Sequence, residues 1–69
     1  MYELFFKVGN RTTCYVFKDL PECARKILYL CTLSHKLGIP YDWDVTHTDQ
    51  NGNANYVIIW RIFDCLVSE

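Results

Sequence analysis

Cysteine, aspartate and histidine are the residues of this chain that could do chemistry, and their spacing limits what that chemistry can be. The four cysteines follow the pattern C-x8-C-x7-C-x33-C, which lacks the C-x2-C knuckle of zinc sites. Cys23 and Cys31 fall in one predicted helix, about 12 Å apart at ~1.5 Å per residue, which is too far for a disulfide or a shared metal. We expect four reduced thiols that pack as small hydrophobic groups, with a Cys14–Cys65 bridge as the alternative.

A second candidate is the segment DWDVTH, residues 42–47, which could supply a pair of carboxylates and an imidazole. Strand alternation places Asp42 and Asp44 on one face and His47 on the other. A small sheet offers no obvious cleft that would shift a carboxylate pKa. Ser34 and the cysteines also lack the context of a catalytic nucleophile. We therefore predict no enzymatic activity, no metal and no cofactor.

Composition narrows the class of protein. The chain has 69 residues, of which 51% are hydrophobic and 16% aromatic, as expected of one small folded domain. Seven basic and eight acidic residues give a net charge of −1, so the chain has no overall field that would attract a polyanion. No apolar run approaches the roughly 20 residues that span a bilayer, and the N-terminus lacks the layout of a signal peptide. We expect a soluble, cytoplasmic protein that does not bind membranes or a small-molecule substrate.

The elements that position these residues begin with a β-hairpin. Residues 2–8 and 12–18 are rich in aromatic and β-branched residues, and a Gly-Asn pair lies between them. A turn with two central residues would place Leu4 opposite Tyr15 and Phe6 opposite Thr13. A three-residue turn would shift this register.

A helix should follow over residues 20–37. Asp19 can cap its start, Glu22 completes a capping box, and Gly38 followed by Pro40 ends it. Helical spacing gathers an apolar arc that should face the sheet: Leu20, Cys23, Ala24, Ile27, Leu30, Cys31, Ser34 and Leu37.

The remainder predicts a second hairpin around Asn51-Gly52, with residues 54–66 as its last strand. A two-residue turn there sets Trp43 opposite Trp60, His47 opposite Tyr56, and Asp42 opposite Arg61 as an ion pair. The predicted fold is a single α+β domain, residues 1–69, of ββαββ order. It has a four-stranded, mostly antiparallel sheet and one helix packed on one face.

This fold predicts two surfaces that a partner could use. Tyr56, Ile58, Trp60 and Ile62 should meet the helix, and the opposite side of the sheet is left without cover. A central last strand beside the first would gather an apolar cluster on that side, which we expect to bind a protein or a second copy of the chain. Its residues are Phe5, Val16, Val57, Ile59, Arg61 and Phe63.

The second predicted surface is a strip on the polar arc of the helix, where an apolar pair lies among cations. Its residues are Arg25, Lys26, Tyr29, Leu33 and Lys36. An ordinary solvated helix face with one aromatic–aliphatic pair is the alternative for this strip.

One stretch of the sequence resembles a known nucleic-acid-binding fold. The stretch CYVFKDLP resembles the first signature strand of the RNA-recognition fold, which implies Tyr15 or Phe17 as a base-stacking residue. The basic-aromatic second signature is absent, so we assign no family.

We expect a small non-catalytic protein-interaction module, such as an accessory regulator or inhibitor of the kind that phages encode, as a monomer or homodimer. The alternatives are a nucleic-acid binder that uses either Lys7, Arg11 and Lys18 or the strip on the helix, and a structural subunit of a larger assembly.

Overall fold

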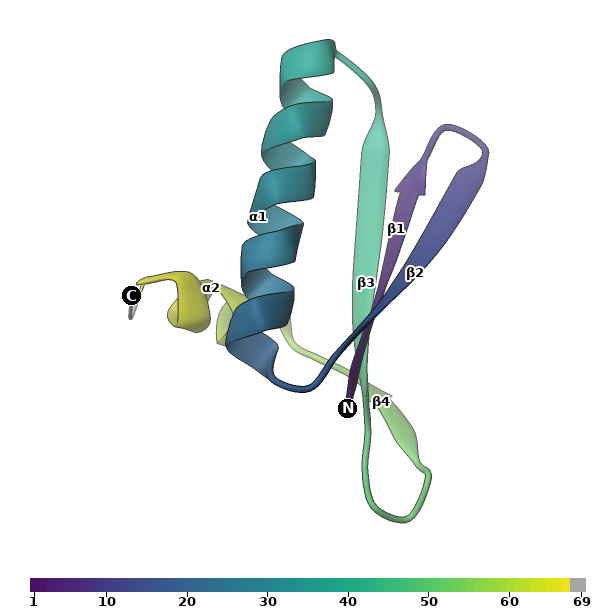
Figure 1. Ribbon diagram of the computed structural model, residues 1–69, viewed down its shortest axis with the longest axis vertical. Coiled ribbons are helices and arrows are strands. Elements are labelled where there is room, and N and C mark those ends of the chain that lie inside the picture. The colour runs from purple at the N-terminus through teal and green to yellow at the C-terminus, as the bar shows by residue number, and fades with distance from the viewer. Residues whose placement is uncertain (68–69) are drawn as a thin grey trace.

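The computed structural model describes residues 1–67 and shows an α+β domain of ββαββα order. A four-stranded antiparallel sheet and two helices make up the fold (Figure 1). The elements are β1 (Tyr2–Val8), β2 (Arg11–Phe17), α1 (Leu20–Leu37), β3 (Tyr41–Thr48), β4 (Ala54–Tyr56) and α2 (Ile59–Val67). The predicted fold class is confirmed, with the addition of the second helix.

The first hairpin has the predicted two-residue turn and register. Leu4 pairs with Tyr15 and Phe6 with Thr13, as expected. Gly9 takes a φ of 59°, which suits glycine at the first central position of a tight hairpin turn. Because the register is fixed in this way, Leu4 and Phe6 point to one side of the sheet and are buried there.

Helix α1 begins and ends as its sequence predicts. The Asp19 side chain accepts a hydrogen bond of 2.9 Å from the backbone N–H of Glu22. At the other end Gly38 has a φ of 67°, and the N–H of Ile39 donates to the carbonyl of Ser34, which is the Schellman arrangement. Most of the predicted apolar arc is buried or half-buried, but Leu37 is 63% exposed because the last turn of α1 extends past the sheet.

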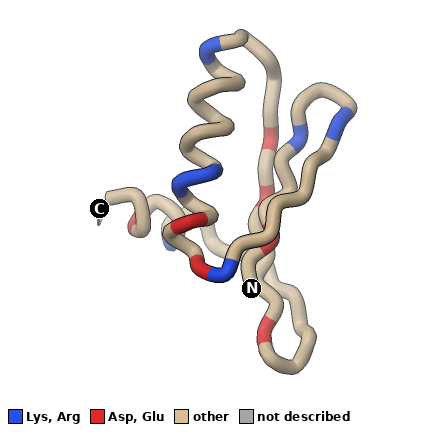
Figure 2. Tube along the Cα trace, in the orientation of Figure 1, with Lys and Arg blue, Asp and Glu red and all other residues tan. Residues whose placement is uncertain are grey.

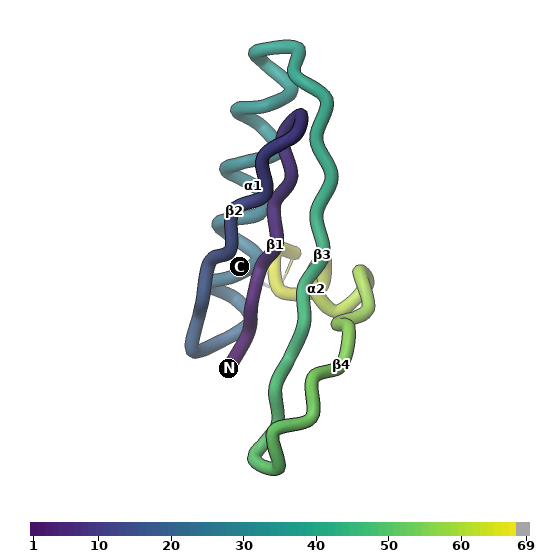
Figure 3. The backbone as a smooth tube through the Cα atoms, turned by 90° about the vertical axis from the view of Figure 1, so that its right-hand side faces the viewer, coloured from purple at the N-terminus to yellow at the C-terminus, as the bar shows by residue number. Residues whose placement is uncertain are grey.

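The strand order is β2-β1-β3-β4, so the first and third strands are central. Helix α1 lies over β1 and β2, and both helices are on the same side of the sheet (Figures 1 and 3). The molecule measures 39 × 30 × 16 Å. In the view down the shortest axis the helices lie beside the sheet (Figure 1), so the shortest dimension is the width across the strands and not the thickness of the two layers. As predicted, the other face of the sheet has no covering element in residues 1–67.

The second hairpin differs from its prediction in turn and register. Its loop is closed by Asp49 and Asn53, whose backbone groups bond at 3.0 Å, and Gly52 takes a φ of 83°. This is a three-residue loop with glycine in the left-handed position rather than a two-residue turn. As a result Tyr56 pairs with Thr46 and not with His47.

The predicted strand over residues 54–66 is wrong beyond Tyr56. The chain leaves β3 after one further hydrogen bond, 2.8 Å from the Val57 N–H to the Val45 carbonyl, and then forms α2. The predicted pairs Trp43–Trp60 and Asp42–Arg61 therefore do not exist, and the last strand lies at the edge of the sheet rather than beside β1. A helix here buries Ile62 completely. A strand over the same residues would leave one of two apolar faces in water.

A single core joins the sheet to both helices. Fully or nearly fully buried side chains come from β1, α1, β3 and α2, and Ile62 from the second helix has no exposed surface. The buried core residues are Leu4, Phe6, Leu20, Cys23, Ala24, Ile27, Val45 and Ile62. Because Ile62 belongs to this cluster, α2 is part of the folded unit and not an appended tail.

Candidate protein-interaction surfaces

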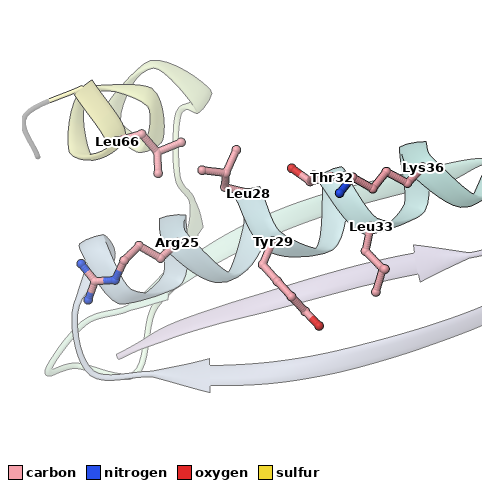
Figure 4. A pocket seen from close by; sticks show the side chains of 7 residues that line it. All are labelled: Arg25, Leu28, Tyr29, Thr32, Leu33, Lys36 and Leu66. Atoms are coloured by element: carbon pink, nitrogen blue, oxygen red, sulfur yellow. The ribbon is translucent and has the colours of Figure 1, made fainter.

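Most side chains of the predicted strip are exposed on α1. Tyr29 is 59% exposed and Leu33 43% exposed, with Lys36 one turn further along the helix. Lys26 is half-buried because its Nζ lies 5.0 Å from the ring centroid of Tyr15 and 5.4 Å from that of Tyr29. In Figure 4, Tyr29 and Leu33 point from α1 toward the side where β2 runs. Tyr29 and Leu33 therefore lean over the β2 edge of the sheet, whereas the Lys36 side chain lies on the Thr32 side of α1.

A hollow of about 490 Å³ runs along the same helix and adds three residues that sequence reasoning missed, Leu28, Thr32 and Leu66. Leu28 of α1 and Leu66 of α2 approach each other on the side of α1 away from Tyr29 (Figure 4). Leu28 falls outside both predicted arcs, so only the position of α2 gives it a neighbour. The remaining lining residues are Arg25, Tyr29, Leu33 and Lys36.

The predicted cluster on the outer face of the sheet is only partly present. Phe5 and Val16 do lie on this open face, because Phe5 pairs with Cys14 and Val16 with Glu3 on the side opposite Leu4. The other four predicted members are not on this face. Val57 lies between β4 and α2, and Ile59, Arg61 and Phe63 lie on α2, because the strand that should have carried them ends at Tyr56.

A further group of exposed apolar side chains lies where the sequence predicts the end of a strand. Trp60 is 70% and Tyr56 77% exposed, and the Trp60 and Phe63 rings meet edge to face with centroids 6.2 Å apart. We call this group the C-terminal apolar surface: Tyr56, Ile58, Ile59, Trp60, Phe63 and Val67. Tyr56, Ile58 and Trp60 were predicted to meet α1, and that prediction is wrong, whereas Ile62 is buried as expected.

A sequence signal for α2 was available. Ile59, Ile62, Phe63 and Leu66 follow the i, i+3, i+4, i+7 spacing of one helical face. The same segment is also rich in β-branched and aromatic residues, which favour strands. Helical periodicity and strand propensity therefore disagree for this segment. Because the segment is short, neither signal decides its secondary structure.

The carboxylates and the imidazole of residues 42–47 are separated, as alternation predicts. Asp42 and Asp44 pair with Lys7 and Phe5, which places both on the open face of the sheet. His47 lies toward the opposite side, where its ring centroid is 4.6 Å from that of Tyr2. Within residues 1–67 no group of three or more His, Cys, Asp or Glu side chains is placed to hold a metal ion.

The four cysteines occupy distinct environments and are all free thiols. Cys14 is exposed on the open face of the sheet, and Cys65 packs against the core on the helix side. Burial, with a smaller contribution from Cys65, raises the pKa of the Cys23 thiol from 9.0 to about 11. Burial also raises the pKa of Cys31, while hydrogen bonds with Tyr41 and Trp43 oppose that shift.

The basic residues do not form one patch. Figure 2 shows the Lys and Arg positions spread over the molecule. Lys7 and Arg11 lie at the hairpin end of β1 and β2, and Lys18 follows the other end of β2. Tyr15 and Phe17, the residues that a resemblance to the RNA-recognition fold would use for base stacking, pack toward the core instead. They are therefore not presented on the open face of the sheet.

Neither helix within residues 1–67 has the length and apolar character needed to cross a membrane. Comparison with protein-family models, with curated proteins and with solved structures found no match to this chain. The case for function therefore rests on the surfaces described above.

Proposed function

We propose that this chain is a small non-catalytic protein-interaction module, an accessory regulator or inhibitor that binds a protein partner and occludes part of its surface. The single observation that carries the proposal is the C-terminal apolar surface. Six large apolar side chains within residues 56–67 are exposed on a domain that already has a complete core. Small monomers rarely leave so concentrated a patch in water.

The composition of this surface supports a protein partner. Tryptophan, tyrosine and phenylalanine are enriched in the buried centres of protein interfaces, where they supply most of the binding energy. Trp60 and Phe63 form such an aromatic pair, and Ile62 anchors the helix beneath them in the core. A rigidly held aromatic pair loses little conformational entropy on binding.

The test is photo-crosslinking in a native lysate, followed by reconstitution with purified partner. A photoreactive phenylalanine analogue in place of Ile58 should capture one protein in stoichiometric yield. With the purified partner, Trp60→Ser and Phe63→Ser should each weaken binding by at least tenfold, as expected of aromatic residues at an interface centre. Leu28→Ser is the matched control, because it also removes an exposed apolar side chain but lies on α1.

Two outcomes would contradict the proposal. If the folded Trp60→Ser variant binds the partner as tightly as wild type, the C-terminal apolar surface does not contribute to the interaction. Recovery that disappears on nuclease treatment would favour the nucleic-acid alternative, and variants of Lys7, Arg11 and Lys18 would then be the ones to weaken binding.

A further inference from the structure

We propose that the β2 edge of the sheet and the strip on α1 together form one interface with a second copy of this chain, related by a two-fold axis. This goes beyond the proposed function, because the C-terminal apolar surface is not part of it. The axis would pass close to Cys14 and Tyr29, and the two sheets would join into one of eight strands.

The outer edge of β2 is open to pairing with another strand. The Met1 carbonyl accepts from the Thr48 N–H across the β1–β3 boundary, so alternation directs odd-numbered residues of β1 toward β3 and even-numbered ones toward β2. The backbone groups of Thr12, Cys14 and Val16 then point away from β1, with no further strand beyond them in residues 1–67. An open edge of seven residues is a ready site for pairing with another strand.

The register of such a pairing follows from symmetry. Cys14 is the central residue of β2, so an antiparallel pair about it sets Cys14 against the partner's Cys14 and Thr12 against the partner's Val16. These side chains lie on the open face and carry no charge. The other edge of the sheet is made by the short strand β4 and by residues 41–44 of β3, which β4 does not cover. That part of β3 carries Asp42 and Asp44, and self-pairing there would bring like charges together. The β2 edge is thus the one that suits a second copy.

The charge pattern of α1 also suits pairing about a two-fold axis, with Glu22, which lies outside the strip, joining its residues. Glu22, Lys26, Tyr29, Leu33 and Lys36 are spaced four and three residues apart, the spacing of a helix-pairing seam. In an antiparallel pair centred on Tyr29, Glu22 lies seven residues before the centre and Lys36 seven after it. Each copy's Glu22 therefore meets the partner's Lys36, and two reciprocal ion pairs form.

One axis satisfies both pairings. The Lys26 Nζ lies 5.0 Å from the Tyr15 ring, and Leu33 shares a hollow of about 230 Å³ with Arg11, Thr13 and Tyr15, so the middle of α1 is level with the middle of β2. Because strands lie ~4.8 Å apart, a helix over the β1–β2 boundary is about 5 Å from the axis, and two such helices are about 10 Å apart. Helices pack at about that distance.

Charge reversal tests the helix contact, with the dimer measured by sedimentation equilibrium. Wild-type protein should form a dimer of twice 8.2 kDa. Glu22→Lys and Lys36→Glu should each raise the dimer dissociation constant about tenfold, since two exposed ion pairs become repulsive. The Glu22→Lys/Lys36→Glu double variant should recover wild-type affinity. Each substitution also places an unfavourable charge near an end of the α1 dipole. If the substitutions acted only by destabilising α1, the double variant would therefore form the weakest dimer.

Cysteine crosslinking tests the strand register. Air oxidation with a copper–phenanthroline catalyst removes two electrons and two protons from a pair of thiols and reduces dioxygen. Wild-type protein should give a covalent dimer that Cys14→Ser abolishes. Arg61→Glu, a charge reversal on α2, is the control and should leave both dimerisation and crosslinking unchanged.

Four results would overturn the inference. The first three are a monomer at all concentrations up to hundreds of micromolar, a double variant that fails to recover, and a covalent dimer that persists in Cys14→Ser. A dimer that Trp60→Ser dissociates and charge reversal does not would also overturn it, and would assign self-association to the C-terminal apolar surface. The first three results have no bearing on capture of a different protein through Trp60, so the two proposals can fail separately. The fourth would also count against the proposed function, because self-association would then account for the C-terminal apolar surface.

Discussion

The Lys26 Nζ on α1 lies 5.0 Å from the ring centroid of Tyr15 on β2, and the same nitrogen is 5.4 Å from the ring of Tyr29. The ammonium group thus bridges the helix to the edge strand without an acidic partner in that contact. Such cation–π contacts contribute about 0.5–1 kcal/mol at partly exposed sites.

Replacing Lys26 with Met should therefore lower the free energy of unfolding by about 0.5–1 kcal/mol, because the aliphatic stem is kept and only the charge over the rings is lost. Urea unfolding at a fixed protein concentration measures the change. Lys18→Met is the matched control, since Lys18 is exposed between β2 and α1, and it should change stability by less than about 0.5 kcal/mol. If the two substitutions lower the free energy of unfolding equally, the cation–π contacts of Lys26 do not contribute to stability.

Ile62→Ala should destabilise the domain by about 2–5 kcal/mol, because it leaves a cavity at a side chain with no exposed surface. If that variant does not fold, Ile62→Val gives a smaller loss of about 0.5–1.5 kcal/mol. Ile58→Ala is the comparison, since Ile58 is exposed and should be nearly neutral. Thermal unfolding followed by circular dichroism measures all three. A neutral Ile62→Ala would mean that α2 does not pack on the core in solution.

The free energy of unfolding should fall as pH rises from about 9 to 11. Burial, and to a lesser extent Cys65, raises the pKa of Cys23 from 9.0 to about 11, so the unfolded chain loses its proton first. The contribution of this thiol is fully present below pH 9 and lost as pH passes through 11. Urea unfolding at a series of pH values should show a shallower fall for Cys23→Ala than for wild type. If the free energy of unfolding falls equally with pH in both proteins, the fall does not come from the Cys23 thiol.

Asp19→Ala should lower stability by about 1 kcal/mol, because the Asp19 carboxylate caps the N–H of Glu22 at 2.9 Å. Asp44→Ala removes the same charge from the exposed face of the sheet and serves as the control. Chemical denaturation of both variants gives the comparison. A loss of similar size in Asp44→Ala would attribute the effect to net charge and not to capping.

Local chemistry was enough to predict the first two-thirds of the fold from the sequence. The Gly9-Asn10 turn fixed the register of the first hairpin, and Asp19 and Gly38 fixed the ends of α1. These signals act over a few residues, so their outcome does not depend on the rest of the molecule. The strip on α1 was predictable for the same reason, since helical spacing alone sets which side chains share a face.

Tertiary structure alone decided the last third. The segment from Val57 to Val67 has the propensity of a strand and the periodicity of a helix, and only its surroundings select between them. Helix α1 covers β1 and β2 and leaves room on the same side of the sheet, and α2 fills that room by burying Ile62. Because of this packing, Ile59 and Phe63 lie in the helix layer and not in the sheet, and Trp60 is exposed. The sequence therefore determined which residues are apolar, and the space left beside α1 determined which of them became core and which became surface.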